Sequence, residues 1–435
     1  MAKDAVGYAL TALNRLAGSG LVDRMGMRRL MERMAYSLTK SGFRVITTTA
    51  RAFQSSGKLG KAERLKAPGV TRELFDLNIT DEQQMIRDSV QSFAEEVLRP
   101  RSEPADAEAR TSDETRAAAL ELGLNFFAVP ESLGGAATER SPVTTMLVAE
   151  DLAHGDMGQA VAILAPMSVA NALTRWGNAD QQSRYLPAFA EDQPPAASLA
   201  VAEPHVLFDP QQLRTTASKS GDQWVLDGEK ALVPLAAEAE LFLVAAQTPD
   251  GPGVFIVEGG TEGLTTSENP PMGVRAGGMR PLQLDSVQVP ESNRLSAEDF
   301  DYREFVDLGT LAWCSLAVGT GQAVLDYVIP YVNEREAFGE PISHRQSVAF
   351  MVANINIELE AMRLLTWRAA SRAQQGLDFH REAYLARVSC AEKAMEIGTN
   401  GVQLMGGHGF IRDNPVELWY RNLRSVGLLE GTAVV

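Results

Sequence analysis

Hydrophobic residues recur at helical spacing from about residue 79 onward. Thr80 is followed three residues later by Gln83, the pattern of a capping box at a helix N-terminus. The apolar positions that follow lie three or four residues apart, as on one face of a helix: Ile86, Val90, Phe93 and Val97. Similar patterns predict helices over about 114–122, 142–154, 158–176 and 180–190. These segments predict an N-terminal helical domain over residues 76–195.

The pattern changes after Pro194 and Pro195, where short segments rich in Val, Leu, Phe and Trp begin. They predict strands near 197–202, 212–218, 223–227, 240–247, 253–257 and 282–289. Gly221-Asp222 is a hairpin signal between two of them, and glycine and proline cluster between others. The pattern indicates a middle antiparallel β sandwich or barrel over residues 196–300.

The helical period returns at about residue 301 and persists. Long helices are predicted over 303–333, 343–374 and 379–405, with short connections. One apolar stripe lies along the second of them: Val348, Met351, Val352, Ile355, Leu359 and Met362. Long helices with short loops indicate an antiparallel C-terminal helical bundle over residues 301–435. The predicted fold is therefore mainly α with a small β domain in the middle.

Residues 1–75 are interpreted as a basic helical extension that ends in a polar, glycine-bearing linker at 55–69. Three hypotheses for this extension stay open. It packs on the body as a helical addition, it binds anionic lipid as a peripheral membrane contact, or it is a transit peptide. Three acidic residues, Asp4, Asp23 and Glu32, count against the transit peptide.

Charge divides the chain into two parts. Residues 1–70 hold thirteen Lys or Arg against four Asp or Glu, a net charge of +9. Because the whole chain carries −16, the other 365 residues carry −25. An acidic body argues against nucleic acid as the main partner.

Composition narrows the class of protein further. The chain has 435 residues, enough for a large core, and it is 45% hydrophobic and 22% charged, as in globular proteins. Its two cysteines, Cys314 and Cys390, stand alone, which favours buried thiols in a reducing compartment. No two of its five histidines lie at helical spacing, so no metal site is expected. No apolar run approaches the roughly 18 residues of a membrane span.

Four short motifs follow one another in the last third of the chain. They are Glu334-Arg335-Glu-Ala-Phe338-Gly339 with Pro341-Ile342 and Gln346, then Gln403-Leu-Met-Gly406-Gly407-His408-Gly409, then Pro415-Val-Glu417 with Tyr420-Arg421, and finally Glu430-Gly431-Thr432. Each motif is weak alone, but their order and spacing are informative together. Over residues 76–435 the chain resembles the acyl-CoA dehydrogenase family of flavoproteins.

The resemblance implies a chemistry and a cofactor, FAD. Members of this family remove hydrogens from the α and β carbons of an acyl-CoA thioester and form a trans-2-enoyl-CoA. By resemblance Glu430 is the base that takes the α-proton, and Gly431 allows close approach of the substrate to the backbone. The residues expected to contact FAD by the same resemblance are Arg335, Phe338, Gln346, Gln403, Gly406, Gly407, Thr432 and Ala202.

Some relatives place the base at the start of the first long C-terminal helix. The matching position here falls near Gly309, where Gly309, Thr310 and Leu311 offer no carboxylate. Glu430 therefore has no rival at that position.

The resemblance also implies partners and a location. In the family the arginine that matches Arg335 reaches the flavin of a neighbouring subunit, so a homodimer or homotetramer is expected. Electron-transfer flavoprotein is the expected electron acceptor. We expect a cytoplasmic protein, with the basic extension on the inner membrane as a further hypothesis and the mitochondrial matrix as the alternative.

The sequence departs from the family pattern where the β domain meets the flavin ring. The family run T-E-P-x-A-G-S-D reads Ala202-Glu203-Pro204-His205-Val206-Leu207-Phe208-Asp209 here, and the family W-I-T reads Leu232-Val233-Pro234. Hydroxyl and aromatic groups are therefore lost, and the chain ends three residues after Thr432, where the family continues. Two alternatives follow: another flavin chemistry, that of an oxidase or monooxygenase, or a non-catalytic subunit without flavin.

Overall fold

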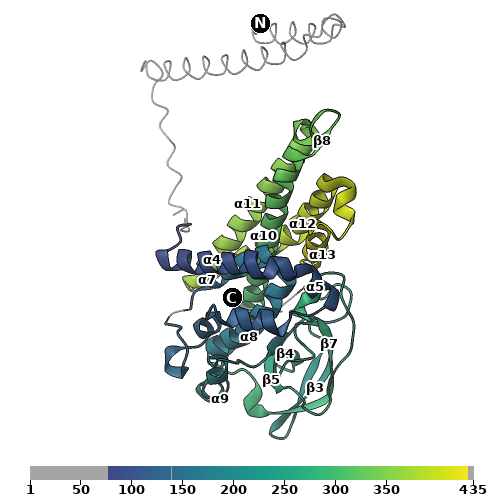
Figure 1. Cartoon of the computed structure of the whole chain (residues 1–435). Helices are drawn as coiled ribbons and strands as arrows, with labels where there is room; N and C mark the ends of the chain where they lie inside the picture. The colour runs from purple at the N-terminus through teal and green to yellow at the C-terminus, as the bar shows by residue number, and fades with distance from the viewer. Residues whose placement is uncertain (1–76, 139, 430–435) are drawn as a thin grey trace, which may run out of the picture. The chain divides into compact units, whose positions relative to one another are not determined.

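A computed structural model describes residues 77–138 and 140–429 (Figure 1). The described residues form N-terminal helices, a curled β-sheet and a C-terminal helical bundle, in the predicted order. The basic extension and linker predicted over residues 1–75 lie outside the described residues, as does the hypothesis of membrane contact that depends on them.

Six α-helices form the N-terminal part. They are α4 Asp81–Phe93, α5 Ser102–Glu108, α6 Asp113–Leu120, α7 Pro142–Gly155, α8 Met157–Trp176 and α9 Ala179–Phe189. The predicted capping box is confirmed, because the Gln83 amide donates to Thr80 Oγ1 over 3.1 Å and the Thr80 amide donates to Gln83 Oε1 over 2.9 Å. α5 was not predicted, since seven residues are too few to show a helical period.

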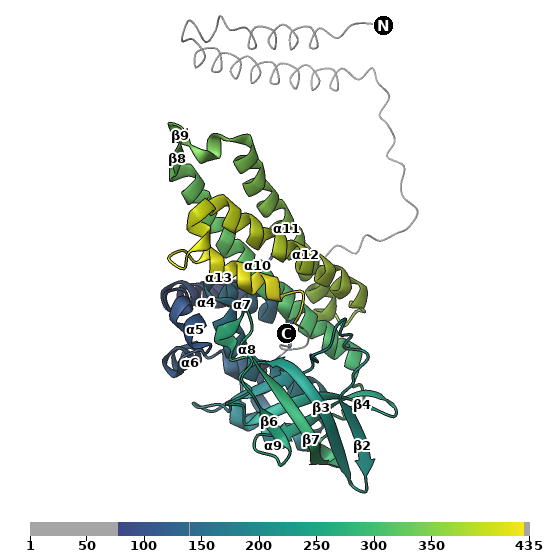
Figure 2. The same ribbon diagram turned by 90° about the vertical axis from the view of Figure 1, so that its right-hand side faces the viewer.

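In the described part of the chain, seven strands form the sheet, in the order β1-β4-β2-β3-β7-β6, with β5 paired to β4. Figure 2 shows β3 and β7 side by side. The strands are β1 Ala197–Ala200, β2 Thr216–Ser220, β3 Gln223–Val233, β4 Leu241–Thr248, β5 Gly251–Glu258, β6 Leu264–Thr266 and β7 Arg280–Pro290. The predicted hairpin is confirmed, since Ser220 pairs with Gln223 across a turn in which Gly221 has a φ of 66°.

The sheet is not wholly antiparallel as predicted. β4 pairs in parallel with both β1 and β2, whereas the other pairings of this sheet are antiparallel. The cause is the long connection between β1 and β2, which lets these two strands flank β4 instead of each other. Strand partners that are distant along the chain leave no signal in local hydrophobic alternation.

The bundle consists of α10 Tyr302–Glu334, α11 Gln346–Gln374, α12 His380–Met405 and α13 Val416–Ser425. The predicted stripe on α11 is confirmed: Ile355, Leu359 and Met362 are fully buried, and its other members are partly buried. α10 packs on α7 as well as on α11 and α12. At the crossing with α7 a Cβ added to Gly319 would lie 1.9 Å from the Glu150 carbonyl oxygen, so only glycine permits this approach.

Within residues 77–138 and 140–429, two helices are long and apolar enough to cross a membrane, contrary to the expectation from apolar runs. They are α8, Met157–Trp176, and α10, Tyr302–Glu334. However, 72% and 94% of their most apolar windows are buried inside the protein, which is the behaviour of core helices.

Asp156 caps α8 in a fully buried position. Its Oδ1 accepts a hydrogen bond from the Gln159 amide over 2.7 Å, but burial raises the pKa of this carboxyl to about 6. A raised folded-state pKa means that the folded protein holds a proton that the unfolded chain releases. The stability from this group is therefore present at low pH and is lost as the pH rises through about 6.

We predict that Asp156→Asn, which retains the capping oxygen but does not ionise, becomes more stable than wild type as the pH rises. Between pH 4 and pH 8 the difference in the free energy of unfolding should grow by about 2–3 kcal/mol. Urea unfolding of both proteins across this range measures it. A difference that does not change with pH would contradict this role of Asp156.

Candidate active site

The segment Met272–Gly277 is held by all three parts of the described chain. From the bundle, the Asn422 Oδ1 accepts a hydrogen bond from the Val274 amide over 2.7 Å. From the N-terminal part, the Thr111 hydroxyl donates to the Ala276 carbonyl over 2.7 Å. The segment itself belongs to the connection between β6 and β7. We call it the junction segment.

Arg421 on α13 fastens the junction segment to the N-terminal helices. Its guanidinium contacts both carboxylate oxygens of Asp106 on α5, at 2.9 and 3.0 Å, and both oxygens of Glu417, at 2.8 and 3.0 Å. It also donates to the Met272 carbonyl over 3.1 Å. Such planar, bidentate geometry suits arginine and not lysine. Arg421 thus joins the bundle, the sheet connection and α5 at one point.

An apolar hollow of about 130 Å³ lies beside the junction segment. Leu232 at the end of β3, Met279, and Leu428 and Leu429 after α13 contribute to its wall. Leu429 is buried and is the last described residue. The predicted base Glu430, together with Gly431 and Thr432, therefore lies outside the described residues, and its role stays a prediction.

Arg335, Phe338 and Gln346 lie together at the far end of the bundle. Arg335 follows the last residue of α10, and Gln346 is the first residue of α11. A tight two-stranded turn separates them, in which Phe338 and Gly339 have φ values of 57° and 83°. Phe338 is 96% exposed. The Arg335 side chain is also exposed and forms no ion pair with any described residue.

Gln403, Gly406 and Gly407 lie where α12 ends, beside the end of α10. The Tyr331 hydroxyl, one turn before Arg335, donates to the Met405 carbonyl over 3.2 Å. Both glycines are exposed, and a Cβ added to either would meet no atom within 4 Å. Their backbone is thus open to a ligand.

Ala202 lies elsewhere, after β1, and is buried. Its neighbour Glu203 accepts hydrogen bonds from the Arg214 and Thr215 amides, at 2.7 and 2.9 Å, and from Lys230 Nζ at 2.8 Å. Burial lowers the pKa of Lys230 to about 8, although Glu203 opposes this shift. The lysine charge and the amide donors lower the pKa of Glu203 despite its own burial. This ion pair fixes the backbone that follows Ala202.

The departures from the family motif take unusual backbone conformations. Leu207, which occupies the motif's glycine position, has a φ of 57°, and Leu232 has a φ of 53°. Both lie in the left-handed region, which costs a leucine about 1–2 kcal/mol. Leu207 is also 93% exposed. The loop therefore keeps a conformation suited to glycine while presenting a bulky apolar side chain.

The structure thus brings six of the sequence-predicted residues together at the outer end of the bundle and places a seventh, Ala202, at the sheet. Figures 1 and 2 both show the β8 end of the bundle pointing away from the sheet. One chain does not bring Ala202 and the other six residues to a single place. Sequence reasoning missed the Asp106–Arg421 contact, because the partners are 315 residues apart and only the Tyr-Arg motif hinted at it.

The position at which some relatives carry the base lies inside the helical core here. Gly309, Thr310 and Leu311 are buried in α10. Among residues 77–138 and 140–429 no cluster of three or more His, Cys, Asp or Glu suits a metal ion.

Comparison with known proteins assigns the family. Three family models match in the order found here: the acyl-CoA dehydrogenase N-terminal domain over residues 80–193, the middle domain over 198–287 and the C-terminal domain over 303–435. The chain belongs to the acyl-CoA dehydrogenase family. It is therefore an oxidoreductase of that family, a group of flavoproteins in fatty acid metabolism.

Relatives in this family are similar over most of their length. The short-chain specific acyl-CoA dehydrogenase of rat mitochondria is 30% identical over 397 residues, covering 88% of this chain and 95% of the relative. An acyl-CoA dehydrogenase of Bacillus subtilis is 29% identical, covering 82% and 96%. The solved butyryl-CoA dehydrogenase of Megasphaera elsdenii has a TM-score of 0.74 at 28% identity, covering 82% and 96%. A solved structure titled as the FAD complex of PigA is 25% identical, with a TM-score of 0.74 and coverage of 82% and 96%.

We predict that Arg421→Met destabilises the protein strongly. The change leaves the partly buried Glu417 carboxylate unpaired and leaves the Asp106 carboxylate with only the more distant Arg275 guanidinium, 3.8 Å away, which costs about 3 kcal/mol. Urea unfolding at neutral pH measures the loss. As a control, Lys393→Met removes a charge that pairs with Glu358, Glu392 and Glu396 on the surface, and it should cost much less because solvent screens surface ion pairs. If both variants lost the same free energy of unfolding, Arg421 would contribute no more to stability than a surface lysine does.

Proposed function

We propose that the protein catalyses FAD-dependent dehydrogenation of an acyl-CoA thioester to the trans-2-enoyl-CoA. The observation that carries this proposal is the ordered set of four motifs, ending in Glu430-Gly431-Thr432, within a chain that matches all three family models. Relatives named for butyryl-CoA and glutaryl-CoA support an acyl-CoA as the substrate class.

The described residues fit the dinucleotide end of FAD. Arg335 offers a fixed cation for a pyrophosphate, and Gln346 and Gln403 offer amides for polar groups. The open backbone at Gly406 and Gly407 offers further donors. The ring end is poorer, because Ala202 and Leu232 carry no polar side-chain atom and Pro234 has no N–H. The fit is therefore good at one end of FAD and weaker at the other.

In the proposed reaction Glu430 accepts the α-proton of the thioester on its carboxylate. Its backbone N–H donates to the carbonyl oxygen on which negative charge develops. Gly431 has no side chain to block the substrate from this N–H. When bound, FAD supplies the acceptor for the β-hydride. The apolar hollow beside Leu429 excludes water near the point where this segment begins.

We further propose that two copies of the chain complete each FAD site. The separation of the two groups of site residues supports this, because the outer end of the bundle lies exposed and far from the sheet (Figure 1). Exposed apolar residues on α11 and α12 suit contact with another copy: Phe350, Ile357, Leu364, Tyr384, Leu385 and Val388. Electron-transfer flavoprotein is the proposed acceptor, and the proposed location is the cytoplasm.

A flavin-free, non-catalytic subunit is the second candidate. Phe208 and Pro234 favour it, because they stand where the family places hydroxyl groups against the flavin ring. Each neutral hydrogen bond lost there is worth about 0.5–1.5 kcal/mol, so two or three losses weaken FAD binding by roughly ten- to a thousandfold.

We predict that Glu430→Gln abolishes reduction of bound FAD by acyl-CoA without changing FAD content. Glutamine keeps the size and hydrogen bonding of the side chain but accepts no proton at neutral pH. Stopped-flow absorbance of the flavin measures the reaction, and Glu121→Gln, an exposed carboxylate on α6's C-terminal side, is the control. Substantial reduction in Glu430→Gln would place the base elsewhere. Oxygen consumption by the wild type would indicate an oxidase instead.

We predict that purified protein holds substoichiometric FAD, which added FAD restores. Arg335→Ala should lose most of it, since a charge-assisted contact is worth about 1.5–3 kcal/mol, or roughly ten- to a hundredfold in affinity. The visible spectrum measures occupancy, light scattering of the same samples tests the dimer or tetramer, and Arg381→Ala is the matched surface control. If the wild-type protein took up no FAD even when FAD was in large excess, the proposal of a dehydrogenase would fail and the flavin-free subunit would replace it. A monomer with full FAD would disprove the shared site.

A further inference from the structure

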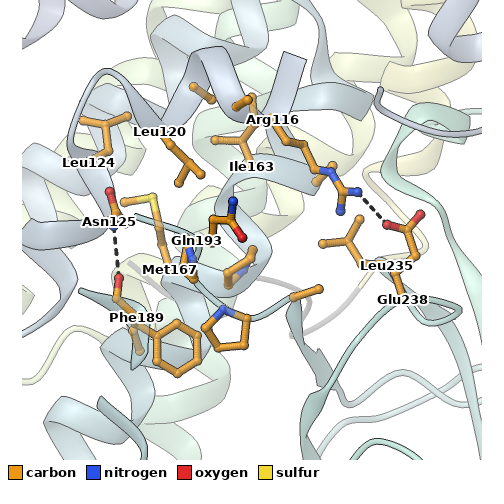
Figure 3. A pocket seen from close by; sticks show the side chains of 18 of the residues that line it. Arg116, Leu120, Leu124, Asn125, Ile163, Met167, Phe189, Gln193, Leu235 and Glu238 are labelled. Carbon is orange, nitrogen blue, oxygen red and sulfur yellow. Dashed lines mark hydrogen bonds and ion pairs between the residues drawn. The ribbon is translucent and has the colours of Figure 1, made fainter. Parts of the chain in front are cut away.

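A cavity of about 550 Å³ lies between the N-terminal helices and the sheet (Figure 3). Its wall comes from α6, α8, the 193–196 connection and the turn between β3 and β4. The volume is within the range of small-molecule sites, about 300–1,000 Å³. No residue that the motifs single out lines it.

This cavity lies further along α8 than the contact between that helix and the junction segment. Ala162, Pro166 and Ala170 line the cavity at intervals of four residues, so they lie along one side of the helix. Gly158 and Val161, nearer the start of α8, pack on the junction segment, where a Cβ added to Gly158 would lie 3.0 Å from that of Ala276. No residue lines both this cavity and the hollow beside Leu429, so the two are separate spaces.

The interior is mainly apolar but contains hydrogen-bond acceptors. Leu120, Leu124, Ile163 and Met167 supply aliphatic surface, as Figure 3 shows. Pro166 has no N–H, so the Ala162 carbonyl four residues earlier lacks the donor that an unbroken helix provides.

Asn125 adds a second acceptor at the wall. Its amide nitrogen donates to the Phe189 carbonyl over 3.0 Å, while its Oδ1 is buried without a hydrogen-bond partner among the described residues. An unpaired buried acceptor is costly, so a ligand that donates a hydrogen bond gains from pairing with it.

The charges around the cavity disfavour an anion. The lining carries three carboxylates, Asp113, Glu238 and Glu240, and the guanidinium of Arg116. Arg116 and the neighbouring Arg110 both pair with Asp113 and with Glu238, at 2.5–2.7 Å, so the excess negative charge is that of Glu240. Glu240 is exposed and forms no ion pair with any described residue. A negative head group would thus meet excess negative charge.

We propose that this cavity binds an aliphatic amphiphile whose head donates hydrogen bonds and carries no negative charge, of the kind of a primary alkyl amine or alcohol. The apolar wall takes the chain, and the acceptors and the acidic lining take the head. This site is independent of the proposed dehydrogenation, whose acyl-CoA substrate is polyanionic.

Three probes with the same chain length test the proposal: decylamine, decanol and decanoate. Each is titrated calorimetrically into the full-length, FAD-supplemented protein at pH 7. The concentrations stay below those at which the probes aggregate. Decylamine and decanol should bind, and decanoate should bind at least about tenfold more weakly. Failure of decylamine to bind, or equal affinity for decanoate, would overturn the proposal.

A variant locates the site. Ala117 lines the cavity on α6 and is exposed, so Ala117→Trp plugs the cavity without disturbing the core. It should weaken decylamine binding at least about tenfold, whereas Glu121→Trp, exposed beyond the end of α6 and outside the lining, should not. Saturating acyl-CoA should leave decylamine affinity unchanged. Unchanged affinity in Ala117→Trp, or competition by acyl-CoA, would place the amphiphile elsewhere and refute the assignment.

Discussion

The contact between Arg421 and Asp106 joins two side chains that are 315 residues apart in the sequence. The guanidinium binds the Asp106 carboxylate, the Glu417 carboxylate and the Met272 carbonyl at once. Because those groups belong to α5, α13 and the junction segment, one side chain sets the relative positions of the helical parts and the sheet. The hollow beside Leu429 exists only where these parts meet. Breaking the contact would therefore disturb the surroundings of this hollow before it disturbed any single helix.

The site residues are divided between two ends of the described chain, and the division has a physical meaning. At the outer end of the bundle, Arg335 and Phe338 are exposed to solvent, a poor arrangement for a large aromatic side chain unless another surface covers it. At the sheet, the backbone after Ala202 is held by the Glu203–Lys230 ion pair, which is fully buried and satisfied by backbone amides. The sheet end is thus held firmly within one chain, whereas Arg335 and Phe338 lie open to solvent, as the proposed contact with a second copy requires.

The sheet end combines strained backbone with apolar side chains. Leu207, at the position where the family motif has glycine, takes the left-handed conformation, and so does Leu232 near the irregular end of β3. Such strained positions persist only where the surrounding structure holds them, and here the buried Glu203–Lys230 ion pair lies nearby in the chain. The loop thus offers fewer hydrogen-bond donors to a flavin ring than the family motif does.

The sequence by itself determined the class and order of the elements. Helical periodicity located α10, α11 and α12 to within a few residues, the capping box located the start of α4, and the glycine turn located the β2–β3 hairpin. These features depend on neighbours three or four residues away, so local patterns carry them. The motifs likewise singled out Arg335 and Gln403 as candidates to contact FAD, since their type and spacing lie within short segments, and that role stays a prediction.

Only the tertiary structure decided the rest. The parallel pairing of β4, the Asp106–Arg421 contact and the cavity beside α8 each join residues that are remote along the chain. Whether a residue of suitable type meets its partner depends on how helices cross and on the order of the strands, and no local period records this. Helix α8 is an example: its sequence predicts one buried apolar helix, but its beginning packs on the junction segment and its middle lines a cavity. That assignment follows from the space left between three packed parts, which no part specifies alone.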